Sequence, residues 1–235
     1  SFFAQKTRKK HLNYEKNNYF CSNNDLFAME FIAQLGVIPF NFDVLASNLG
    51  NYKSPRQKII ELEKQGVIIR LKRGVYVVSP QITKKTVSTE LIANHLYGPS
   101  YVSMESALRF YGLIPERVFN TTSMTLKRSR TFKNQFGQFN YILCPAKYYS
   151  IGISQIIQED YAFLIASPEK ALCDLIVYTP KLQLRSIKSL QTFLEEDIRL
   201  DMDEFYKMDA SIYEKCAEEG KKKTEITNII KLLKK

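Results

Sequence analysis

The stretch FDVLASNLGNYKSPRQKIIELEKQGVIIRLKRGVYVVSP, residues 42–80, decides how the rest of the chain is interpreted. Ser54 before Pro55 is typical of a helix start, because the serine oxygen accepts a backbone N–H and proline loses no hydrogen bond at the first helical position. Gly66 is typical of a helix end. Two β-rich runs follow, and Gly74 between them allows the positive φ of a tight hairpin. Together with a short helix ending before Gly50, this order predicts a winged helix-turn-helix.

In a winged helix the second helix enters the DNA major groove by its N-terminal end, and the wing contacts phosphates or the minor groove. Basic and polar residues of the stretch gather at these two places. The predicted DNA-binding residues are Tyr52, Lys53, Ser54, Arg56, Gln57 and Lys58 at the helix, and Arg70, Lys72 and Arg73 on the wing. The alternative is a winged helix that binds a protein and has a solvated basic turn.

Composition and charge indicate an anionic partner. The chain has 235 residues, is 45% hydrophobic, and carries a formal net charge of +10. Residues 1–80 hold 12 Lys and Arg against 6 Asp and Glu, and the other 155 residues hold 22 against 18, so the excess is +6 and +4. Nucleic acid is the favoured partner class. No apolar run approaches the ~20 residues of a membrane span and no signal-peptide pattern opens the chain, so we expect no membrane partner and a cytoplasmic location.

The motifs of common enzyme classes are missing from the sequence. The nine glycines are too scattered for a phosphate-binding loop, and there is no H-E-x-x-H or G-x-S-x-G. The cysteines, which form no C-x-x-C pair, and the two histidines do not complete a zinc site of usual spacing. The sequence therefore predicts a protein that is not an enzyme and has no metal or cofactor.

Patterning along the chain predicts an α+β protein in three segments. Residues 1–24 read as a polar tail or basic arm, 25–80 as the winged helix, and 81–235 as a mixed domain. In the mixed domain, short β-like runs predict a mainly antiparallel sheet, and the pattern beyond Pro180 is helical. The last helix, Thr224–Lys235, has an amphipathic stripe, which favours packing over partner binding.

A second basic cluster lies in the mixed domain. It consists of Lys127, Arg128, Arg130 and Lys133, and aromatic residues follow it. Basic residues interleaved with aromatics are compatible with RNA or single-stranded DNA. A β-hairpin with a solvated, charged tip is the alternative interpretation.

Two long strings lie beyond the predicted wing. They are SALRFYGLIPE, residues 106–116, and SPEKALCDLI, residues 167–176. The winged helix precedes both strings and a β-rich segment lies between them. The order and spacing of these parts resemble the AbiEi antitoxins of abortive-infection E systems, a type IV class of toxin–antitoxin system. The resemblance covers roughly residues 42–178.

This resemblance implies a function in phage defence. AbiEi-like proteins are transcriptional regulators whose winged helix binds inverted repeats in the promoter of their own operon and represses it. Their C-terminal domain neutralises a nucleotidyltransferase-like toxin, and a stable complex is not required. We therefore expect operator DNA and such a toxin as partners, with a dimer or two monomers on the DNA. The cluster of Lys127, Arg128, Arg130 and Lys133 is the candidate antitoxin surface. A general regulator without a toxin partner is the alternative.

Overall fold

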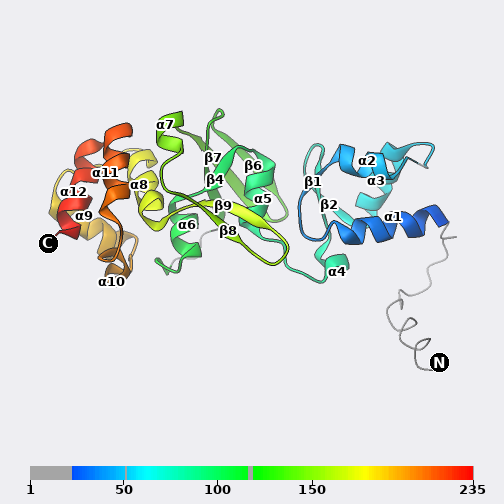
Figure 1. Cartoon of the computed structure of the whole chain (residues 1–235), viewed down its shortest axis with the longest axis horizontal. Helices are drawn as coiled ribbons and strands as arrows, with labels where there is room; N and C mark the ends of the chain where they lie inside the picture. Colours follow the sequence, from blue (N-terminus) through cyan, green and yellow to red (C-terminus); the bar gives the residue numbers. More distant parts are fainter. Residues whose placement is uncertain (1–22, 51, 116–118, 235) are drawn as a thin grey trace, which may run out of the picture.

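A computed structural model describes residues 23–50, 52–115 and 119–234 (Figure 1). It is a mixed α+β structure with one antiparallel sheet, one mixed sheet and a helical C-terminal region. Most of the predicted polar tail, residues 1–24, lies outside the described residues, although α1 already begins at Asn23.

The N-terminal part packs helices on a small sheet. Its elements are α1 (Asn23–Gln34), β1 (Phe40–Asn41), α2 (Phe42–Asn48), α3 (Pro55–Lys64), β2 (Ile68–Lys72), β3 (Val75–Val78) and α4 (Pro80–Thr83). The strands pair antiparallel in the order β1-β3-β2. Ile32, Leu45, Ile59 and Leu62 are almost fully buried in one apolar cluster that holds the helices to the sheet.

Local sequence explains where α3 and the hairpin begin and end. The Ser54 side chain accepts a hydrogen bond from the backbone N–H of Gln57 at 3.4 Å, and Pro55 takes the first helical position. Gly66 has a φ of 70° after the helix, and Gly74 has a φ of 78° in the hairpin turn. These conformations favour glycine. The predicted cap, helix end and turn are confirmed.

The central part is built around a six-stranded sheet. Its elements are α5 (Thr89–Leu96), β4 (Ser100–Val102), α6 (Met104–Phe110), β5 (Asn120–Thr125), β6 (Arg130–Asn134), β7 (Gly137–Leu143), α7 (Ala146–Tyr149), β8 (Ile153–Ile157), β9 (Ala162–Ala166) and α8 (Pro168–Tyr178). The strand order is β6-β7-β5-β4-β9-β8.

Three of the five strand pairings in this sheet are antiparallel and two are parallel. Strand β7 lies between β6 and β5. It pairs antiparallel with β6 and parallel with β5. The sheet is therefore mixed, and it has more parallel pairing than the expected mainly antiparallel arrangement.

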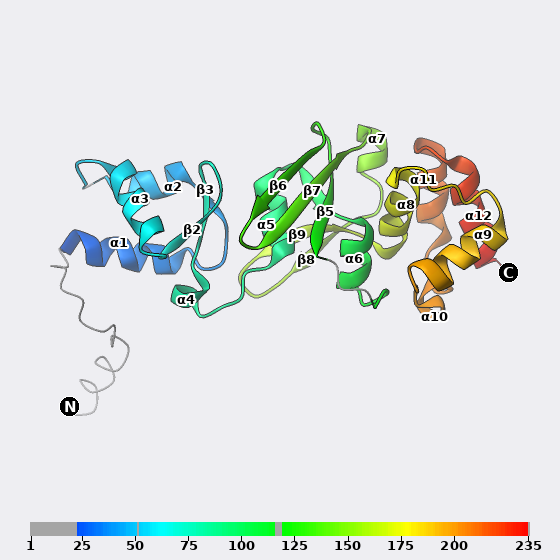
Figure 2. The same ribbon diagram turned by 180° about the vertical axis from the view of Figure 1, so that it is seen from behind.

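Helices form the end of the molecule opposite the N-terminal part (Figure 2). They are α9 (Ile187–Thr192), the π-helical turn η1 (Phe193–Asp197), α10 (Met202–Phe205), α11 (Ala210–Glu219) and α12 (Lys223–Leu233). Ile226, Ile229 and Leu232 of α12 are buried in the same apolar core as the sheet and α8. The expectation that the last amphipathic helix packs on the fold is confirmed.

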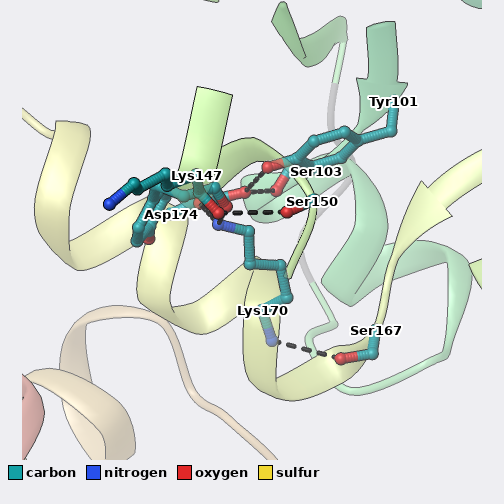
Figure 3. A network of polar contacts seen from close by, with 8 residues as sticks. Tyr101, Ser103, Lys147, Ser150, Ser167, Lys170 and Asp174 are labelled. Carbon is teal, nitrogen blue, oxygen red and sulfur yellow. Dashed lines mark hydrogen bonds and ion pairs between the residues drawn. The ribbon is translucent and has the colours of Figure 1, made fainter. Parts of the chain in front are cut away.

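A buried polar network joins α8, which carries the second long string, to strand β4 and to the residue before α6 (Figure 3). Lys170 and Asp174 of α8 have no exposed side-chain surface, and the Lys170 Nζ lies 3.0 Å from Asp174 Oδ1. The Lys170 ammonium also donates to the Tyr148 carbonyl at 3.0 Å. A buried ion pair needs such additional partners, because desolvation offsets much of its Coulomb attraction.

The other carboxylate oxygen of Asp174 accepts two hydrogen bonds. Ser103 Oγ donates at 2.6 Å and the Tyr101 hydroxyl donates at 3.1 Å. Ser103 occupies the position before α6, but its side chain makes no cap hydrogen bond. A serine at this position is typical of an N-cap, but here its hydroxyl fixes α8 to the chain that precedes α6.

Candidate nucleic-acid interface

The N-terminal end of α3 presents positive charge to solvent. Lys53, Arg56 and Gln57 are exposed, and the first turn contains no acidic residue. The partial positive charge of a helix N-terminus adds to that of the side chains. This end of α3 is therefore suited to an anionic partner.

Two further residues of the predicted helix site face each other. The Lys58 Nζ lies 5.3 Å from the centre of the Tyr52 ring and 3.3 Å from Glu61 Oε1. Both side chains are half-buried. Lys58 thus contacts its own helix and the preceding loop, in contrast to the exposed Lys53 and Arg56.

Three arginines from separate elements surround one hollow. Arg56 comes from α3, Arg70 from β2 and Arg73 from the hairpin turn, and the hollow has a volume of about 530 Å³. Its other lining residues are Phe42, Ile59, Ile60, Gly74 and Tyr76. The structure therefore brings the predicted helix and wing residues together around an apolar floor with a cationic rim.

The cations of the hairpin are held in different ways. Arg70 forms an ion pair with Glu63 of α3, and its guanidinium lies 5.9 Å from the centre of the Tyr76 ring. Lys72 points to the central sheet, where its ammonium donates to the Leu96 carbonyl at the end of α5. Arg73 is exposed at the turn. Of the three predicted wing residues, only Arg73 is both exposed and, within the described chain, without an ion pair.

Burial lowers the pKa of the Lys72 ammonium, and the nearby charges of Lys127 and Arg130 lower the pKa further. These two residues belong to the second predicted cluster. The structure therefore places a residue of the predicted wing beside residues of the candidate antitoxin surface.

The four residues of the second basic cluster lie on, or just before, the edge strand β6. Arg130 pairs in register with Tyr141, and Phe132 pairs with Phe139. The side chains of Tyr141 and Phe139 are buried on the face of the sheet that α5 covers, so Arg130 and Phe132 lie on this face too. Since side chains alternate along a strand, Lys133 projects from the opposite face. Lys127 and Arg128 precede the strand, and all four cations are exposed. The cluster is thus one region in sequence but presents its charges on two faces.

The sequence did not reveal the aromatic side chains that contact Arg70 of the hairpin and Arg130 of β6. Tyr76 lies directly opposite Arg70 in the hairpin register, and Phe132 lies two residues after Arg130 on one face of β6. Counting outward from the Lys72–Val75 pair would place Val77 opposite Arg70, and a shift of register between Arg70 and Lys72 brings Tyr76 there instead. No local sequence signal indicates that Leu96 receives Lys72, since they lie in separate parts of the fold.

Neither a metal site nor a membrane-spanning helix is found in the described part of the chain. Across residues 23–50, 52–115 and 119–234, no group of three or more His, Cys, Asp or Glu side chains is arranged to hold a metal ion. No helix in the described ranges is long and apolar enough to cross a membrane.

Comparison with known proteins supports the fold alone. No family model and no curated protein matches this chain. The crystal structure of the Rv2827c protein from Mycobacterium tuberculosis is similar, with a TM-score of 0.51 and 11% sequence identity over 91% of this chain and 83% of that one. At this identity the similarity concerns the arrangement of elements and carries no activity across.

Proposed function

We propose that this chain is a sequence-specific DNA-binding repressor and that residues 25–80 form a winged helix-turn-helix. The observation that carries the proposal is the convergence of Arg56 from α3 with Arg70 and Arg73 from the hairpin around one hollow. The exposed, positively charged N-terminal end of α3 lies beside it. A helix end with a neighbouring basic hairpin matches the geometry with which a winged helix binds a duplex.

In this proposal the residues have separate tasks. Arg56 and Gln57 read base edges in the major groove, where arginine pairs with guanine and glutamine with adenine. Lys53 and Arg73 contact phosphates, which position the protein without reading sequence. Ser54 keeps the end of α3 ordered at the DNA surface.

The resemblance to AbiEi proteins supplies the biological context. We propose that the chain binds inverted repeats in the promoter of its own operon, as a dimer or as two monomers. We also propose that the part after residue 80 acts as antitoxin to a nucleotidyltransferase-like toxin, with Lys127, Arg128, Arg130 and Lys133 as the candidate surface. Co-expression with such a neighbouring gene tests this function: continued toxicity in the presence of this chain contradicts it.

Replacing Arg56 tests base reading by α3. We expect Arg56→Ala to weaken binding to the upstream intergenic DNA by about 1–3 kcal/mol, or roughly 5- to 150-fold, if its guanidinium contacts a base. Fluorescence anisotropy with labelled duplexes provides the measurement. Lys64→Ala is the matched control, because Lys64 is an exposed cation at the other end of the same helix. Equal affinities for the two variants would contradict the assignment.

A further inference from the structure

A basic seam lies where the β2–β3 hairpin meets the edge strand β6. We define the basic seam as Lys72, Lys127 and Arg130. Figures 1 and 2 both show the hairpin between helices α1–α3 and strand β6. The Asn134 side-chain amide donates to the Leu71 carbonyl at 3.2 Å, which fixes the hairpin against β6. The seam is therefore a single surface made by two distant parts of the sequence.

The cations of the seam lie over two neighbouring aromatic rings. The Lys72 Nζ is 5.5 Å and the Arg130 guanidinium carbon is 4.9 Å from the centre of the Phe132 ring. The Lys127 Nζ is 5.3 Å from the centre of the Tyr97 ring. The two ring centres are 5.6 Å apart. Three positive charges thus gather in a small area.

Their positive charge is only partly compensated within the fold. The Lys72 ammonium donates to the carbonyl of Leu96, which carries the partial negative charge of the α5 C-terminal end, and the Lys127 ammonium donates to the carbonyl of Gly98, two residues further on. In the part of the chain that the structure describes, no seam cation forms an ion pair with a carboxylate. An added anion would relieve the repulsion among the three cations.

We infer that the basic seam binds the sugar–phosphate backbone of the DNA duplex, beyond the segment contacted by α3. The inference rests on the proposed function and extends the DNA footprint onto the central sheet. A duplex is favoured because one hairpin carries cations of both groups: Arg73 lines the hollow with Arg56, and the adjacent Lys72 belongs to the seam. A duplex carries one charge per about 1.7 Å of its axis, so it offers phosphates to both groups.

The test compares two charge-neutralising double variants of the full chain. K127Q/R130Q removes two seam cations and leaves Lys72 at the end of α5. K147Q/K188Q is the matched control, because it removes two exposed lysines elsewhere and gives the same net charge. Affinity is measured by fluorescence anisotropy at several salt concentrations, on one duplex of the upstream intergenic sequence and one random duplex, each of about 30 base pairs, roughly three helical turns.

We expect K127Q/R130Q to bind both duplexes on the order of tenfold more weakly than the control at about 0.15 M salt. The slope of log K against log salt should fall by about 1 to 2, since each lost phosphate contact removes about 0.9. The ratio of affinities for the two duplexes should not change, because phosphate contacts carry no sequence information.

Three results would overturn the inference. In the first, the two variants have equal affinities and salt slopes. In the second, K127Q/R130Q has a lower melting temperature but an unchanged salt slope, which would mean that Lys127 and Arg130 only stabilise the fold near the end of α5. In the third, DNA binding is intact and binding of an acidic partner protein is lost. Failure of the proposed function has a different signature, in which the wild-type chain does not prefer the intergenic duplex. The random duplex still tests the seam in that case.

Discussion

Among single residues, Asp174 is expected to be one of the most costly to replace. Its carboxylate is fully buried between the Lys170 ammonium and the Tyr101 and Ser103 hydroxyls. Asp174→Ala would leave a buried ammonium without its counter-charge, which costs about 3–5 kcal/mol of the free energy of unfolding. Urea denaturation followed by circular dichroism measures the change.

The double variant K170M/D174N separates the charge from the packing. Methionine removes the buried cation, and the asparagine oxygen still accepts from Ser103. We expect this variant to be more stable than Asp174→Ala, because replacing both members of a buried pair costs less than removing one. If the double variant is the less stable of the two, the ion pair does not dominate the energetics of this site.

The thiol of Cys144 tests how tightly the central core is packed. Burial raises its pKa to about 12, and the thiols of Cys173 and Cys216 are buried as well. The pKa of the Cys173 thiol is also raised by burial, whereas the hydrogen bond with Cys173 lowers the pKa of Cys216, which burial alone protects. Since the thiolate is the reactive form and all three sulfur atoms are buried, we expect these residues to resist alkylation at pH 8 until the protein unfolds. Mass spectrometry of a Cys21→Ser variant, treated with iodoacetamide with and without denaturant, gives the count. Rapid modification of the folded variant would contradict the packing around Cys144.

The connection between helices α11 and α12 depends on the small size of Gly220. A Cβ atom on Gly220, between α11 and α12, would lie 2.5 Å from the Cys216 carbonyl oxygen and 2.7 Å from the Tyr148 ring. We expect Gly220→Ala to cost about 1–3 kcal/mol of the free energy of unfolding through overpacking. Thermal denaturation measures it, and Gly50→Ala is the comparison, because Gly50 has no positive φ and a Cβ there would lie 3.7 Å from the Ser47 carbonyl oxygen, an ordinary contact distance. A Gly220→Ala variant that is at least as stable as Gly50→Ala would argue against the clash.

Elements with local signals were predictable from the sequence. Ser54 caps α3 as expected, and Ser167 caps α8 with the same Ser-Pro pattern. Strand order was not predictable in this way, because the β5–β7 parallel pairing depends on where β6 lies. The same limit applies to polar side chains: Ser103 has the pattern of an N-cap, but its partner Asp174 is 71 residues away.

The candidate site was predictable to a similar extent. The sequence predicted Lys53, Arg56 and Arg73 among the DNA-binding residues, and all three are exposed in the structure. The tertiary contacts of Lys72 and Arg70 were not visible, because Leu96 and Glu63 gave no sign of pairing with the hairpin. Cation–aromatic contacts such as Arg130 over Phe132 likewise depend on strand β6, whose register is set by β7.

For the molecule as a whole, the hairpin links the N-terminal part to the central sheet. Leu71, Val75 and Val77 of the hairpin belong to the apolar core of the central part, whereas Ile68, Tyr76 and Val78 belong to that of the N-terminal part. Both faces of the hairpin are therefore packed. We infer that DNA bound at α3 and at the hairpin would also contact the central part, which is where the proposed antitoxin function lies.

We propose that this chain recognises the DNA upstream of its own gene. The most direct measurement is the ratio of its affinities for the intergenic duplex and for random duplex of equal length, at two salt concentrations. Specific protein–DNA complexes are typically about 10³- to 10⁷-fold tighter than non-specific ones, and phosphate contacts weaken steeply with salt. We predict a clear preference for the intergenic duplex at both salt concentrations, with both affinities falling as salt rises. Equal binding of the two duplexes would contradict the proposed repressor function.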